Sequence, residues 1–143
     1  MINAQIHTLR EPDGSPVANV AFDLSAEQLA AASHALVEVV HDRHRHEALE
    51  TDDVLALREL TAVRDEFERL VAAEGHATLV MMLARLIVLH DALDEYVAAQ
   101  AERDWRREAD REALPVLEAM LGPLAGLRAD AVAEALRAAA QFT

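Results

Sequence analysis

The 143-residue chain contains no cysteine, which excludes disulfide scaffolds, cysteine-type zinc sites, iron–sulfur clusters and thiol catalysis. It also contains no lysine: its 13 basic residues are all arginine and are outnumbered by 26 acidic residues, so the formal net charge is −13. Aromatic residues make up only 3% of the chain, which leaves few side chains to stack on bases. Because a protein that neutralises nucleic-acid phosphates needs a basic face, direct nucleic-acid binding is not expected.

Glycine and proline are scarce, with four of each, and the glycines are scattered. No phosphate-cradling loop or dinucleotide-binding fingerprint can be built from them. The few hydroxyl side chains lie in predicted turns, caps or helix faces, and none occupies a nucleophile elbow. These absences favour a non-catalytic protein.

Neither a targeting segment nor a membrane span is apparent. The first residues lack the basic and apolar regions of a signal peptide, and the densest apolar run, 77–89, is short and contains Arg85. We therefore expect a cytoplasmic protein of bacterial type. With 52% hydrophobic residues, the chain has enough apolar side chains for a core, and its length fits a single domain over 1–143.

Residues 1–24 have the pattern of a β-hairpin. Apolar residues alternate with polar ones on both sides of the turn segment 11–16, in which Pro12, Asp13 and Gly14 favour a tight reversal. A lone hairpin is marginally stable in water, so it must pack on helices or pair with another copy. This argument predicts a homodimer.

Residues 25–143 are predicted to form a helical bundle with three main helices. Ser25 and Gln28 form a capping box before a helix over 26–46, and Thr51 begins a second helix that ends at Glu74–Gly75. A third helix is predicted to begin near Thr78, because leucines follow a helical spacing from there.

Beyond residue 101 the charged segment 102–108 reads as a solvated helix extension or a surface for a partner. Pro115 is expected to end or kink the helix, and Gly122, Pro123 and Gly126 to separate a short helix from a final one over 129–141. The predicted fold is thus mainly α: an N-terminal β-hairpin, then three main helices and two short C-terminal ones.

Three potential metal ligands share one face of the first predicted helix: His34, Glu38 and His41 lie at i, i+4 and i+7. Neutral imidazoles and a carboxylate suit divalent transition metals. The simpler interpretation is a solvated, histidine-rich face, since these residues lie opposite Leu36 and Val40.

His90 lies within the apolar line of the third predicted helix, with Asp94 one turn later. A histidine beside a carboxylate can extend a metal site or act as a base, but it is more often a buried polar group with a satisfied hydrogen bond.

Trp105 stands among charges beside Arg106, a composition common at binding hot spots, although the ring can also fold back over the bundle. The leading functional hypothesis is an acidic interaction or regulatory module with a protein partner, which binds through the hairpin edge, the Trp105 segment, or both. Three alternatives remain open: a metal-binding bundle, an acidic mimic of nucleic acid, and a pH sensor. In the last case, protonation of all seven histidines moves the net charge from −13 to −6.

Overall fold

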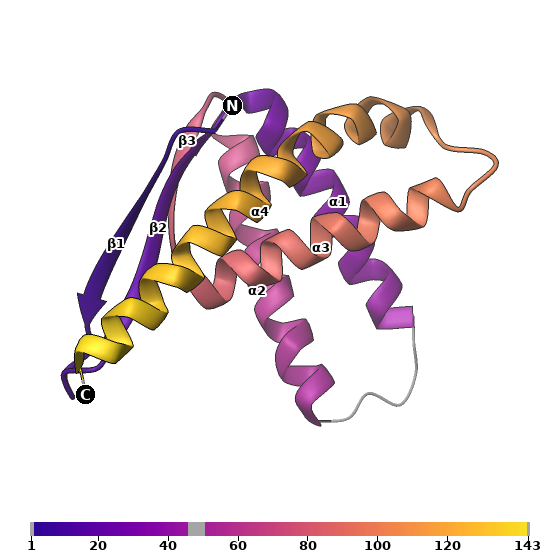
Figure 1. The fold of residues 1–143 in the computed structure, drawn as a ribbon. Coiled ribbons are helices and arrows are strands. Elements are labelled where there is room, and N and C mark those ends of the chain that lie inside the picture. The colour runs from indigo at the N-terminus through magenta and orange to yellow at the C-terminus, as the bar shows by residue number, and fades with distance from the viewer. Residues whose placement is uncertain (1, 46–50, 143) are drawn as a thin grey trace.

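The computed structural model describes residues 2–45 and 51–142, without the side chains of 51–53 and 142. The described part of the chain is mainly helical, with a three-stranded antiparallel sheet and four helices (Figure 1). In chain order the elements are β1 (Ala4–Arg10), β2 (Pro16–Leu24), α1 (Ala26–Arg45), α2 (Thr51–Ala72), β3 (Ala77–Met82), α3 (Leu83–Ala101) and α4 (Glu108–Phe142). None of the described helices is long and apolar enough to cross a membrane.

The predicted hairpin is confirmed. β1 and β2 pair antiparallel, from Ala4 opposite Phe22 to Arg10 opposite Pro16. At the turn, the Asp13 carboxylate accepts hydrogen bonds from the amide and the hydroxyl of Ser15, and Gly14 has a φ of 88°. A positive φ is easily reached by glycine, which explains why the turn forms at this point.

The third helix was predicted to begin near Thr78, and this is wrong. Residues 77–82 form β3, which pairs with β2 and makes β2 the central strand. Leu79 and Met81 are buried while Val80 and Met82 are exposed, an alternation typical of a strand with one buried face. The hairpin therefore finds its stabilising strand within the same chain, and the argument from a lone hairpin no longer requires a second copy.

The sheet and the helices form two layers. All four helices lie on one side of the sheet (Figure 1), and α4 runs beside both β1 and β2. Val20, Phe22 and Leu24 of β2 face the helices and are almost completely buried. The residues between them in sequence face the opposite way, so no helix among the described residues covers that face of the sheet.

Helix boundaries in the first half of the chain follow local chemistry, as predicted. The Ser25 amide donates to Gln28 Oε1 over 2.9 Å, and the Gln28 amide donates to Ser25 Oγ over 3.1 Å, which completes the capping box of α1. α2 ends just before Glu74 and Gly75, which have φ values of 52° and 127°. Thr51 was predicted to cap α2 and His46 to end α1, but the side chain of Thr51 and the whole of His46 lie outside the part of the chain that the structure describes.

The predicted division of the C-terminal region is wrong in two ways. Residues 102–107 are a loop, not a helix extension, and α4 continues unbroken through Pro115 and Pro123. Each proline deprives the helix of one hydrogen bond, but both lie on its exposed side. On its other side, buried residues recur every three or four positions across both prolines: Ala113, Leu117, Met120, Leu124, Leu127 and Ala131. Their burial outweighs the two lost hydrogen bonds.

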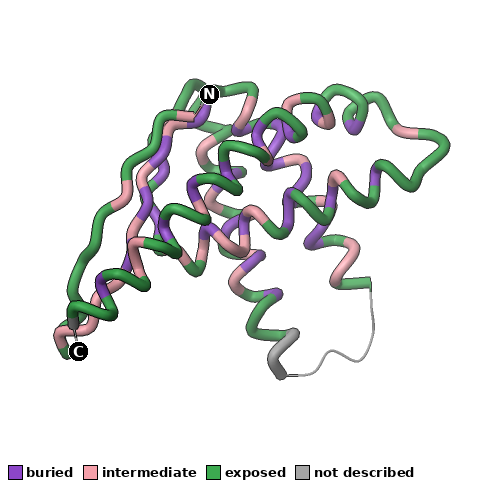
Figure 2. The backbone as a smooth tube through the Cα atoms, viewed as in Figure 1, coloured by how far each residue is buried: buried purple, intermediate pink, exposed green. Residues whose placement is uncertain are grey.

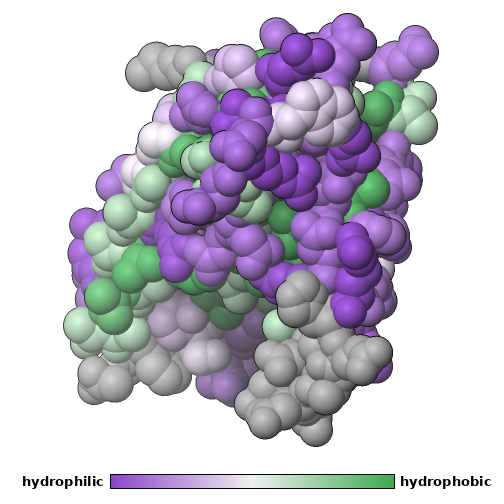
Figure 3. All heavy atoms as spheres, turned by 90° about the vertical axis from the view of Figure 1, so that its right-hand side faces the viewer, coloured by the Kyte–Doolittle hydropathy of each residue, from purple (hydrophilic) through white to green (hydrophobic). Residues whose placement is uncertain are grey.

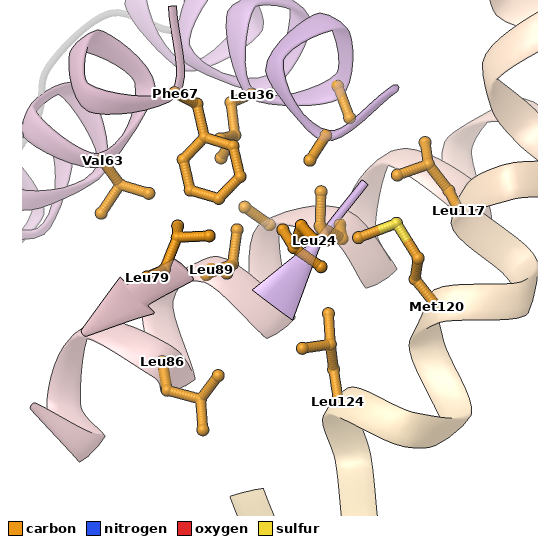
Figure 4. Close-up of a cluster of buried hydrophobic side chains, with 14 of the residues drawn as sticks. Leu24, Leu36, Val63, Phe67, Leu79, Leu86, Leu89, Leu117, Met120 and Leu124 are labelled. Atoms are coloured by element: carbon orange, nitrogen blue, oxygen red, sulfur yellow. The ribbon is translucent and has the colours of Figure 1, made fainter. Parts of the chain in front are cut away.

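The core lies between the sheet and the helices. Buried positions follow the inner side of the sheet and the facing sides of the helices (Figure 2). Figure 4 shows Leu24 of β2, Phe67 of α2, Leu79 of β3 and Met120 of α4 converging on this space. Because strands and helices contribute to one cluster, the sheet provides a wall of the core rather than a separate unit.

Candidate functional site

A completely buried carboxylate, that of Asp110, lies where α1, α3 and α4 meet. Its Oδ1 lies 2.7 Å from His34 Nε2 of α1 and also accepts a hydrogen bond from the Tyr96 hydroxyl of α3. Its Oδ2 accepts a hydrogen bond from Arg107 Nε over 3.2 Å. A buried charge is costly unless it is fully hydrogen-bonded, and here three donors surround it.

These contacts determine the ionisation of the group. Burial by itself raises the pKa of Asp110, but the hydrogen bonds from His34, Tyr96 and Arg107 outweigh it and lower the pKa to about 2. The same burial, together with the bond to Asp110, raises the pKa of the Tyr96 phenol. Asp110 is therefore a carboxylate at neutral pH and acts only as an acceptor.

Arg107 extends the network towards the surface. Its Nη2 lies 2.6 Å from Glu38 Oε1 of α1, while its Nε holds Asp110. Hydrogen bonds to Glu38 and Asp110 raise the pKa of the guanidinium further. The cluster of His34, Glu38, Tyr96, Arg107 and Asp110, which we call the Asp110 network, links three helices and the α3–α4 loop.

The three residues proposed as metal ligands on α1 have different surroundings. His34 pairs with Asp110, Glu38 pairs with Arg107, and His41 is exposed beside a groove that Arg45 also lines. Over residues 2–45 and 54–141, no three histidine or acidic side chains are arranged to hold a metal ion. Two of the three proposed ligands, His34 and Glu38, are therefore already hydrogen-bonded to Asp110 and Arg107.

His90 and Asp94 do not join this cluster. His90 is half-buried, and its Nδ1 lies 3.1 Å from Arg128 Nη1 of α4. The same guanidinium nitrogen donates to Asp91 over 2.6 Å, whereas Asp94 is exposed. The partner that the structure gives His90 is therefore an arginine of α4 rather than the carboxylate one turn later.

Trp105 exposes 74% of its surface, so its ring does not fold back over the helices. The neighbouring Arg106 donates from Nε and Nη2 to the carbonyl of Gln100, and so satisfies an end of α3. Of the two residues singled out in this loop, Arg106 has a structural contact and Trp105 faces outward.

Sequence reasoning did not identify Asp110 or the hydroxyl of Tyr96. The signal for Asp110 was its position three residues before Ala113 and seven before Leu117, which places it on the buried line of α4. A charged residue on such a line needs partners, and two of its three partners, His34 and Tyr96, are 76 and 14 residues away in sequence.

The second feature is the face of the sheet that the helices leave uncovered, which we call the outer face. The strand register places five apolar residues on it: Leu9, Val17, Ala21, Val80 and Met82. Val80 is 63% exposed, and Leu9 and Met82 are each about half exposed. The remaining positions are polar: Gln5, His7, Asn19, Asp23 and Thr78.

The outer face contains few charges. Asp23 is the only carboxylate among its strand residues, although 27% of the whole chain is charged. This carboxylate accepts a hydrogen bond from Thr78 on the neighbouring strand. By contrast, hydrophilic residues predominate on the side of the molecule opposite the sheet (Figure 3). Depletion of charge with exposed apolar side chains distinguishes the centres of protein interfaces from ordinary surface.

Acid titration tests the Asp110 network. Since the pKa of Asp110 falls from its ordinary 3.8 to about 2 on folding, its ionisation stabilises the fold fully above about pH 5, and this stabilisation disappears as pH falls towards 2. As the pH falls over that range, we expect the free energy of unfolding of the native chain to decrease by about 2 kcal/mol more than that of Asp110→Asn. Urea unfolding of both proteins at each pH measures it; a difference independent of pH contradicts the assignment.

We compared the chain with protein-family models, curated proteins and solved structures, and none of them matches it.

Proposed function

We propose that this protein is an acidic, non-catalytic protein-interaction module and that the outer face of its sheet is the binding surface. The observation that supports the proposal is the combination of exposed apolar residues and a single carboxylate on that face. An uncovered sheet face of this composition is well suited to pack against another sheet.

We propose further that the partner is a second copy of the chain. Two molecules with a net charge of −13 repel each other in most orientations. When they meet through their outer faces, the nearly uncharged surfaces are in contact and the charged helices point away from each other. The contact is also self-complementary, as a two-fold dimer requires.

The size of the face sets the expected strength of this dimer. From a strand spacing of about 4.8 Å and a rise of about 3.4 Å per residue, two such faces bury on the order of 1,000 Å² in total. This lies at the low end of specific interfaces. We therefore expect a dimer that dissociates on dilution rather than a permanent one.

Light scattering over a dilution series tests this proposal. The mass should decrease from twice 15.7 kDa towards 15.7 kDa as the protein is diluted. Because the surface is apolar, added salt should not dissociate the dimer and should strengthen it by screening the repulsion between the acidic copies. A mass of one chain at every concentration and salt level rejects the homodimer and leaves the outer face available to a different protein.

A further inference from the structure

Asn19 lies at the centre of the outer face. It belongs to the central strand β2, with His7 opposite it on β1 and Met82 opposite it on β3. Among the outer-face positions of the described strands, only Asn19 and Ala21 have a paired residue on both sides. A dimer through this face buries most area when the two centres coincide, so we expect its two-fold axis to pass close to these residues. The inference that follows rests on the proposed dimer.

The carboxamide of Asn19 lacks the hydrogen bond that its burial requires. Its Oδ1 is buried and accepts no hydrogen bond from any described residue, although the residue as a whole is only half-buried. A buried acceptor without a donor is destabilising, and most such atoms in folded proteins have a partner. The last torsion of an asparagine side chain has a broad energy profile, so rotation brings the oxygen to the surface when a donor arrives. A second copy of the chain supplies such a donor.

The position of Asp23 decides the direction of the axis. Asp23 lies on β2 four residues after Asn19, at one end of the outer face. An axis running along β2 brings Asp23 opposite its own copy, and like charges that face each other in an interface repel. An axis that crosses the strands at Asn19 instead separates the two copies of Asp23 by about 27 Å along the strands, at a rise of about 3.4 Å per residue. The residues opposite their own copies are then Asn19, His7 and Met82, none of which is acidic.

We infer that the two-fold axis of the dimer crosses β2 at Asn19, where the carboxamides of the two copies hydrogen-bond each other. Each Nδ2 donates to the Oδ1 of the other copy, so one reciprocal pair satisfies both buried oxygens. Packed sheets lie about 10 Å apart, and two asparagine side chains that meet end to end, with a hydrogen bond of about 2.9 Å between them, bridge that gap. A polar pair at the centre of an apolar interface specifies one orientation at a cost in affinity. Asn19 is therefore the residue that determines how the two copies are oriented.

Replacing Asn19 with valine tests this role. Valine favours a strand and removes the polar pair, so Asn19→Val should dimerise at least as tightly as the native chain in sedimentation velocity but lose its unique orientation. A spin label at Glu118→Cys, an exposed position of α4, reports the orientation. The native dimer should give one narrow distance, and Asn19→Val a broad or multiple distribution. An unchanged narrow distance in Asn19→Val, or a broad distribution in the native dimer, overturns the inference.

Gln5→Val is the matched control for the valine variant. It removes another carboxamide from the outer face, but from the edge strand β1 and away from Asn19. The label at position 118 should therefore keep the native distance. A distribution as broad as that of Asn19→Val overturns the assignment of orientation to Asn19. Urea unfolding verifies that each variant is folded.

Aspartate at the same two positions locates the axis. In Asn19→Asp two carboxylates meet on the axis, whereas in Gln5→Asp they lie at least about 14 Å apart along the strands. Asn19→Asp should therefore weaken the dimer at least tenfold more than Gln5→Asp, and equal weakening overturns the placement of the axis. Failure of the native chain to dimerise is a different result, because it rejects the proposed function and this inference together. A native dimer that neither Asn19 variant alters rejects this inference alone.

Discussion

Replacing Asp110 with alanine is expected to lower the free energy of unfolding by about 3–5 kcal/mol. The substitution leaves the buried hydroxyl of Tyr96 and the half-buried imidazole of His34 without an acceptor, and Arg107 without one of its two carboxylates. For a chain of this length, a loss of 3 kcal/mol lowers Tm by roughly 10 °C. Thermal and urea unfolding measure the effect.

Asp130→Ala is the matched control for this prediction. Asp130 lies on the same helix, α4, but is exposed, so its removal should change stability by less than about 0.5 kcal/mol. Similar losses for the two variants indicate that the Asp110 network does not hold the three helices together. A loss below about 1 kcal/mol for Asp110→Ala leads to the same conclusion.

Val80→Asp should weaken the proposed dimer by on the order of 100-fold. Val80 lies midway along β3, an edge strand of the sheet, on the outer face opposite Ala21 of the central strand β2. In a two-fold dimer the substitution buries one unpaired carboxylate from each copy, which costs several kcal/mol. Sedimentation velocity over a concentration series measures the change in dissociation constant.

Two further variants separate the loss of binding from the added charge and from damage to the strand. Val71→Asp adds the same charge at an exposed valine of α2 and should leave the dimer intact. Val80→Thr retains the β-branched shape that strands favour and should weaken the dimer much less than aspartate does. If Val71→Asp dissociates the dimer as strongly as Val80→Asp, the interface is not the outer face.

The elements predicted correctly from the sequence are those determined by neighbouring residues. The turn at Asp13 and Gly14 and the capping box of Ser25 and Gln28 depend on contacts within four positions, so local chemistry was sufficient. The end of α2 at Gly75 belongs to the same group. Each of these features can be predicted without knowledge of the tertiary structure.

The errors occurred where distant parts of the chain decide the structure. Leu79 and Leu83 fit a helical line, while Leu79 and Met81 fit a strand, and only pairing with β2 far earlier in the chain selects the strand. Pro115 and Pro123 locally oppose a helix, yet the buried side of α4 continues through both. In each case tertiary burial overrode a local preference.

The same limit applies to the candidate site. His34 and Glu38 were recognised as chemically notable, but their partners Asp110 and Arg107 lie 76 and 69 residues further along the chain. Without knowledge of the fold, histidine and glutamate on one helix face indicate a metal site as readily as a hydrogen-bond network. The outer face was also inaccessible to sequence reasoning, because β3 had been predicted as part of a helix.

The interaction surface can be tested most directly by measuring distances between spin labels in the dimer, since a cysteine-free chain allows one label per copy. Gln5→Cys places the label on the outer face, and Asp104→Cys places it in the α3–α4 loop, away from the sheet (Figure 1). If the outer faces meet, the distance between the two copies must be shorter for the label at position 5 than for the label at position 104. The reverse order, or no dipolar coupling at either position in concentrated protein, contradicts the outer face as the interface.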